Sequence, residues 1–218
     1  MARGCRKEEC DLRYTDRGGY PLRVAPLLFN HYCTMPDIKP WKTLESKLVL
    51  DTPYYKVRMD VCQLPDGTII QDFCVREEPD AVIAFCVTRE GQVVLVHQYR
   101  HAVDRETTEL PGGFTSRHDI NTAEAARREL LEETGYSSEK MEEVAVLDMN
   151  DSSSSAKIYV YVALDAERVT APEFRSREQT ETALVPKEQL LTMVKDGTIR
   201  SSNQIAAIHC LEKYLKTE

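Results

Sequence analysis

Between residues 43 and 100 the chain repeats one pattern five times: nine to eleven residues rich in Val, Ile, Leu, Tyr and Phe, followed by residues that favour turns. Such runs are typical of β-strands. They cover residues 43–51, 54–64, 68–76, 80–88 and 92–100. "PDGT" joins the second run to the third and "REGQ" joins the fourth to the fifth, which predicts two hairpins. The pattern therefore predicts an antiparallel meander.

The remainder of the chain mixes helical and strand-like segments. Helices are predicted over residues 122–134, 186–197 and 201–216, and strands over 143–149, 157–164 and 181–186. Strands interspersed with helices indicate a layered α/β domain.

Residues 1–40 show no sustained periodicity and are expected to form an irregular leader. They contain Cys5, Cys10, His31 and Cys33. The spacing does not fit the short knuckles that usually hold structural zinc, so free thiols are favoured over a zinc site.

Charge and cysteine content restrict the partners and the compartment. The 218-residue chain has a formal net charge of −8, which argues against nucleic acid or an anionic membrane as the main partner. An acidic protein can still bind a phosphorylated small molecule through a metal cation. The seven cysteines are scattered and odd in number, and the N-terminus lacks a signal peptide's apolar core, so a cytoplasmic protein is expected.

The segment "RRELLEETGY", residues 127–136, carries three glutamates close together. Asn121 and Gly135 have the residue types of helix caps, and Glu124 stands in the capping-box position. At roughly 100° per residue, Glu129, Glu132 and Glu133 fall within an arc of about 100°. Clustered carboxylates repel one another unless a cation such as Mg²⁺ or Mn²⁺ binds them. The alternative is a solvated acidic face.

Upstream, "ELPGGF" places two glycines before this helix, where backbone could approach a ligand. Together, "GGFTSRHDINTAEAARRELLEETGY" resembles the signature of the Nudix hydrolase family. From Arg128 to Tyr136 the chain matches every defined position of the second half of that signature.

The first half departs from the signature. Counted back from Arg128, Ile120 stands where the family has a glutamate, and the loop from Gly113 is one residue longer. In the family this glutamate commonly supports the loop and the arginine. Asp119 or His118 could take over part of that role.

The resemblance looks closest to the ADP-ribose and nucleotide-sugar pyrophosphatase branch. It implies an α/β/α sandwich with a mixed sheet over residues 79–218, preceded by a small antiparallel β subdomain over residues 41–78. In this branch the subdomain supports a homodimer and base binding, which makes Trp41 a candidate to stack on the base.

The same resemblance assigns roles to single residues. The Gly112 carbonyl, Glu129 and Glu133 would bind a metal, and Glu132 would hold a further metal or its water. Arg100 and Glu109 would contact the substrate. Counting back from the proline that opens the next helix, the catalytic base would be Glu178, with Glu181 as second choice.

The sequence thus predicts a Mg²⁺-dependent hydrolase, with Mn²⁺ as a possible substitute, that cleaves the pyrophosphate of a nucleoside diphosphate sugar. ADP-ribose, giving AMP and ribose 5-phosphate, is the expected substrate. A catalytically impaired Nudix domain that binds a nucleotide or regulates a partner is the alternative. An RNA-end-processing enzyme is disfavoured by the net charge of −8.

Overall fold

Two antiparallel hairpins form the first sheet of the protein. The computed structural model describes residues 38–53, 55–172 and 180–215. Strands β1 (Lys42–Asp51), β2 (Lys56–Gln63) and β3 (Ile69–Glu77) make a three-stranded sheet in the order β1-β2-β3. The turn predicted at residues 65–68 joins β2 to β3, with Gly67 at φ 90°.

The second sheet is mixed and contains eight of the described strands. Its central path runs β11-β5-β4-β10-β8, with β6 on β5, β7 on β4 and β9 on β10. Only β4 and β10 among these pair in parallel. The strands are β4 (Ala81–Thr88), β5 (Gln92–Arg100), β6 (Arg105–Glu109), β7 (Gly112–Phe114), β8 (Tyr136–Ser137), β9 (Lys140–Asp148), β10 (Lys157–Arg168) and β11 (Thr180–Pro186).

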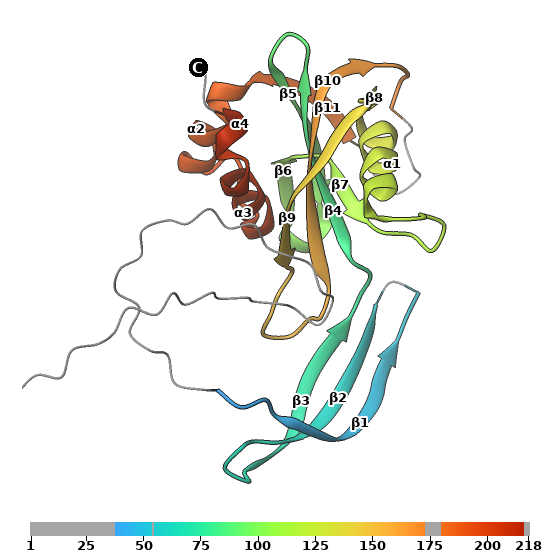
Figure 1. The fold of residues 1–218 in the computed structure, drawn as a ribbon, viewed down its shortest axis with the longest axis vertical. Helices are drawn as coiled ribbons and strands as arrows, with labels where there is room; N and C mark the ends of the chain where they lie inside the picture. Colours follow the sequence, from blue (N-terminus) through green and yellow to red (C-terminus); the bar gives the residue numbers. More distant parts are fainter. Residues whose placement is uncertain (1–37, 54, 173–179, 216–218) are drawn as a thin grey trace, which may run out of the picture. The chain divides into compact units, whose positions relative to one another are not determined.

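Helices cover both faces of this sheet. Helix α1 (Thr122–Thr134) lies on one face, and α2 (Leu190–Lys195), α3 (Ser202–Cys210) and α4 (Glu212–Leu215) lie on the other (Figure 1). Strand β4 shows why, because its side chains alternate between two cores. Ile83 and Phe85 pack in the core under the C-terminal helices, whereas Ala84 and Cys86 pack in the core under α1. The predicted α/β/α layering is confirmed.

Helix α1 begins and ends where its sequence signals predict. The Asn121 side chain accepts a hydrogen bond from the Glu124 N–H at 2.9 Å, and Gly135 ends the helix at φ 74°. The Glu124 carboxylate accepts from the N–H of Ile120, one residue earlier than in the usual capping box. Both ends of α1 are therefore fixed by local chemistry.

Several sequence predictions need correction. The antiparallel meander predicted over residues 43–100 is divided between the two sheets, since β3 pairs with β2 and β4 pairs with β5. The single helix predicted over residues 201–216 is divided, because the Leu211 N–H bonds to the Ile208 carbonyl three residues back and ends α3 in a tighter turn. Strands β6, β7 and β8 were not predicted; the two glycines of β7 have low β-propensity. Among the described residues, no helix is long and apolar enough to cross a membrane.

Candidate active site

The backbone of β7 is directed toward helix α1. Bonds from the Ala84 N–H to the Pro111 carbonyl and from the Thr115 N–H to the Asp80 carbonyl flank this strand. Hydrogen-bonded and non-hydrogen-bonded pairs alternate in an antiparallel ladder. Gly112 and Phe114 occupy non-hydrogen-bonded positions, so their N–H and C=O groups point away from β4.

Side chains of α1 bind two of these outward backbone groups. The Gly112 N–H donates to the Glu133 carboxylate at 2.9 Å, and Arg128 Nη2 donates to the Phe114 carbonyl at 3.2 Å. The Gly112 carbonyl leaves the strand on the same side as its N–H. A backbone oxygen and the carboxylates of α1 thus share one side of β7.

Neighbouring atoms lie so close to Gly112 and Gly113 that neither position has room for a Cβ. A Cβ added to Gly113 would lie 2.7–2.8 Å from the carboxyl atoms of Glu129, and one added to Gly112 would lie 2.2 Å from the Val82 carbonyl oxygen. The Glu129 carboxylate therefore packs directly on the backbone of Gly113. The contacts with Glu129 and with Val82 together account for the paired glycines upstream of α1.

Arg128 connects the loop to the helix through all five of its N–H donors. Nη1 donates to Glu129 at 2.6 Å and to Glu132 at 3.1 Å, whereas Nε and Nη2 donate to the two carboxylate oxygens of Asp119 at 2.9 and 3.0 Å. The fifth bond is the one to Phe114. The hydrogen bonds to Asp119, followed by the one to Glu129, raise the pKa of Arg128. A guanidinium with every donor used has a fixed position.

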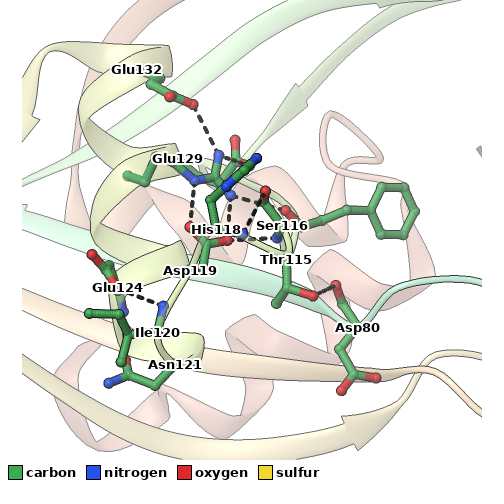
Figure 2. Close-up of polar contacts among 12 residues, drawn as sticks. Asp80, Thr115, Ser116, His118, Asp119, Ile120, Asn121, Glu124, Glu129 and Glu132 are labelled. Carbon is green, nitrogen blue, oxygen red and sulfur yellow. Dashed lines mark hydrogen bonds and ion pairs between the residues drawn. The ribbon is translucent and has the colours of Figure 1, made fainter.

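Asp119 makes the contact with the arginine that was expected of the signature glutamate, which this chain lacks. Its side chain, 6% exposed, lies beside the helix carboxylates, and the hydrogen bonds from Arg128 lower its pKa (Figure 2). Ile120 is 86% exposed and turned away from this cluster. Counted forward from Gly113, Asp119 stands at the signature's spacing, so the additional residue lies between Asp119 and Arg128. His118 was the other candidate to contact Arg128, and its ring lies against Arg117.

The glycine loop, Arg128 and two of the α1 carboxylates border a cavity of about 510 Å³. Five residues for which the sequence predicted a metal-binding or substrate-binding role line it: Arg100, Glu109, Gly112, Glu129 and Glu133. Glu109, whose side chain is 12% exposed, accepts a hydrogen bond from Arg100 Nη2 at 2.8 Å. The hydrogen bond to Glu109 thus keeps the positively charged Arg100 side chain, which comes from β5, at the cavity wall. Its charge is opposite to that of a phosphate.

The other predicted site residues lie elsewhere. Glu132 is not among the residues that line the cavity, but it reaches the site through Arg128. Glu181 is an exposed residue of β11, paired in register with His97 of β5, and it does not line the cavity. Trp41 is 46% exposed and packs edge-on against Phe73, with ring centroids 5.6 Å apart. Glu178, like Cys5, Cys10, His31 and Cys33, lies outside the described residues.

The donor set fits a hard divalent cation. Two carboxylates, Glu129 and Glu133, lie against the backbone of the loop whose Gly112 carbonyl leaves β7 on the same side. Among the residues that the structure describes, no three His, Cys, Asp or Glu side chains are arranged to hold one ion. A cation at this site would therefore take carboxylate oxygens, the carbonyl and water, as Mg²⁺ does.

Family models match most of the chain. The model described as the NUDIX domain matches residues 77–207, more than half of the sequence. The chain belongs to the Nudix family. A second model, described as the nucleoside diphosphate sugar hydrolase N-terminal domain, matches residues 41–75. The protein is a Nudix hydrolase related to the nucleoside diphosphate sugar hydrolases.

Individual relatives of this Nudix hydrolase are distant. A methanol dehydrogenase activator of Bacillus methanolicus is 27% identical over 172 residues, which cover 78% of this chain and 92% of that protein. An ADP-ribose pyrophosphatase of Bacillus subtilis (strain 168) is 24% identical over 172 residues, with the same coverage. The crystal structure of an ADP compounds hydrolase has the same fold, with a TM-score of 0.71 at 18% identity over 83% of this chain and 97% of that one.

Proposed function

We propose that this Nudix hydrolase cleaves the pyrophosphate bond of a nucleoside diphosphate sugar with the help of Mg²⁺, and that ADP-ribose is its substrate. Water would add to one phosphorus and the bridging P–O bond would break, giving AMP and ribose 5-phosphate. The observation that carries the proposal is the packing of Glu129 and Glu133 on the Gly112–Gly113 backbone, at the wall of a cavity that also holds Arg100. The ADP-ribose pyrophosphatase name of a relative supports the choice of substrate.

The protein would bind the diphosphate with groups from both sides of the cavity. The Gly112 carbonyl, Glu129 and Glu133 would hold Mg²⁺, with Glu132 near a further ion or its water. Bound Mg²⁺ neutralises phosphate charge and lowers the pKa of water. Mn²⁺, with the same preference for oxygen ligands, is the expected substitute.

Arg100 would contribute the main direct contact with the anionic substrate. Glu109 accepts a hydrogen bond from one nitrogen of its guanidinium, which orients the planar group. A guanidinium presents a rigid fork of N–H groups, the geometry that binds phosphate or a ribose hydroxyl. The pair would thus act as a substrate-binding unit.

A carboxylate from the segment around β11 would take the proton from the attacking water. We propose Glu178 for this role, with Glu181 as second choice. Glu181 is exposed on β11, so it would need to approach the cavity to act. General bases of this kind contribute about 10²- to 10⁴-fold to a rate.

The three-stranded sheet would serve base binding and dimerisation. Roughly half of the Trp41 surface is exposed, which leaves its ring available to stack on a purine. Strand β1 also exposes Leu44, Leu48 and Leu50, an apolar set that a second copy of the chain would cover. Cytoplasmic localisation is proposed as well, because Cys62, Cys74, Cys86 and Cys210 are free thiols.

The test is release of phosphate products from a panel: ADP-ribose, other ADP-sugars, GDP-mannose, UDP-glucose and NADH. Each compound is incubated with Mg²⁺ and with chelator, using the wild-type protein and Glu133→Gln. We expect ADP-ribose to be hydrolysed only with Mg²⁺ and the substitution to abolish turnover. Turnover of a different compound would correct the substrate. An increase in melting temperature with ADP-ribose, without any turnover, would show a binding module and refute the enzymatic proposal.

A further inference from the structure

The residue that leads into the glycine loop is held by a side chain from the far end of the sequence. Gln204 of α3 is 7% exposed and lies beside Leu110, which is 1% exposed. Its Oε1 accepts from the Leu110 N–H at 2.9 Å, and its Nε2 donates to the Leu110 carbonyl at 3.2 Å. One amide thus satisfies both backbone groups of one residue.

The position of Leu110 explains why it needs this partner. Strand β6 ends at Glu109 on β5, and β7 begins at Gly112 on β4, so Leu110 lies between two ladders and belongs to neither. Buried backbone groups without partners are costly. The reversed orientation of the Gln204 amide would set donor against donor and acceptor against acceptor, so its orientation is determined by Leu110.

We propose that Gln204 is a positioning residue for the active site: by clamping Leu110 it sets where Glu109 and the Gly112 carbonyl lie in the cavity. The inference rests on the proposed function, which gives the positions of Glu109 and of the Gly112 carbonyl their role. Glu109 directly precedes the clamped residue, and Gly112 follows it by two. Gln204 also lines the cavity itself.

The experiment compares Gln204→Leu, which removes both bonds at similar volume, with Gln204→Glu, which keeps an acceptor for the N–H and faces the carbonyl with a second oxygen. His209→Gln is the matched control, because His209 lies on the same helix with its side chain 79% exposed. Melting temperature is recorded for all variants. The assays run well below the lowest melting temperature, so that only folded protein is compared.

With the substrate that the wild type hydrolyses, both Gln204 variants are expected to lose roughly 10- to 100-fold in kcat, since misplacement by about 1 Å can cost 10²-fold. The control is expected to match the wild type. A purely structural role would lower the melting temperature and leave kcat, KM and the metal requirement of the folded protein unchanged. That result would overturn the proposal.

A second readout separates this inference from the proposed function. Mn²⁺ affinity, measured by electron paramagnetic resonance of the free ion, does not depend on turnover. Gln204→Leu is expected to weaken Mn²⁺ binding by roughly tenfold, at the lower end of the 10- to 100-fold effect of partners that orient metal ligands. If the wild type binds Mn²⁺ but hydrolyses nothing, the proposed function fails and the affinity ratio alone decides on Gln204. Equal affinities, or a wild type that binds no Mn²⁺, would overturn the Gln204 proposal.

Discussion

The two halves of the Nudix signature reach the same contact network by different means. In the helix half, Arg128, Glu129, Glu132 and Glu133 occupy fixed positions on α1, so their spacing in sequence determines their spacing in space. In the loop half, Asp119 reaches Arg128 from a segment one residue longer than the signature. In the helix half, the number of residues between the side chains is fixed. In the loop half that number can vary, provided that a carboxylate still reaches Arg128.

This difference shows how an irregular segment can absorb an insertion that a helix cannot. One added residue in α1 would rotate the following side chains by about 100° and move Glu132 and Glu133 off the face that meets the loop. An added residue before Asn121 leaves the Asp119 carboxylate on the guanidinium and directs Ile120 into solvent. The comparison can be tested by substitutions in each half.

Arg128→Lys is expected to have the largest effect, because one ammonium cannot replace five N–H groups that bind four different residues. We expect kcat to fall by more than the roughly 10- to 100-fold typical of one partner that orients a metal ligand. Steady-state kinetics with the hydrolysed substrate measure it. Near-wild-type turnover would mean that the two halves act independently.

Gly113→Ala tests the contact where the halves meet. The added methyl would lie within 2.8 Å of the Glu129 carboxylate, so either the carboxylate or the loop must move. A loss of about 10²-fold in kcat is expected from such a displacement. Gly91→Ala is the control for glycine replacement, because nothing lies within 4 Å of its added Cβ, although its φ of 77° makes it a strained turn. Equal kcat losses in both variants would point to general destabilisation.

Asp119→Ala tests the loop half alone. It removes two of the five bonds of Arg128 and leaves the guanidinium on Glu129 and Glu132. We expect kcat to fall by roughly tenfold, at the lower end of the effect of ligand-orienting partners. The Mg²⁺ concentration for half-maximal rate should rise in the same variant. Unchanged kinetics would show that the contact is dispensable.

Ile120→Glu is expected to have the smallest effect. It restores the residue type of the signature at the position counted from Arg128, but on a side chain that is 86% exposed and directed away from the cluster. Activity should stay within about twofold of the wild type, as is usual for surface substitutions. Combined with Asp119→Ala it should not rescue activity. Rescue would show that the loop can slip by one residue and that the register is not fixed.

Much of this site is predictable from sequence because its signals are local. Asn121 and Gly135 define both ends of α1 through contacts within a few residues, and the helical repeat then places the three glutamates. In β4 the two-residue repeat of a strand determines which side chains face which core, and alternate side chains enter different cores. In both cases, interactions between residues close in the sequence are sufficient to predict where the side chains lie.

Contacts between distant segments were not predictable in this way. The sequence left the choice between Asp119 and His118 open, because the direction of a loop side chain depends on the whole turn, including the bond from the Ser116 N–H to Asp119 at 2.6 Å. Gln204 carries no signal at all, since a glutamine in an amphipathic helix is usually solvated. Its buried position follows from the packing of α3 on the sheet.

The bond between Gln204 and Leu110 also determines when the site can form during synthesis. The two residues are 94 positions apart, and translation at about 5–20 residues per second separates their appearance by several seconds or more. The sheet and α1 are complete only after β11, which ends at Pro186, has been made, and the loop then still lacks its clamp until Gln204 follows. A growing chain would therefore complete the sheet and α1 first, and the clamped loop only when α3 has emerged from the ribosome.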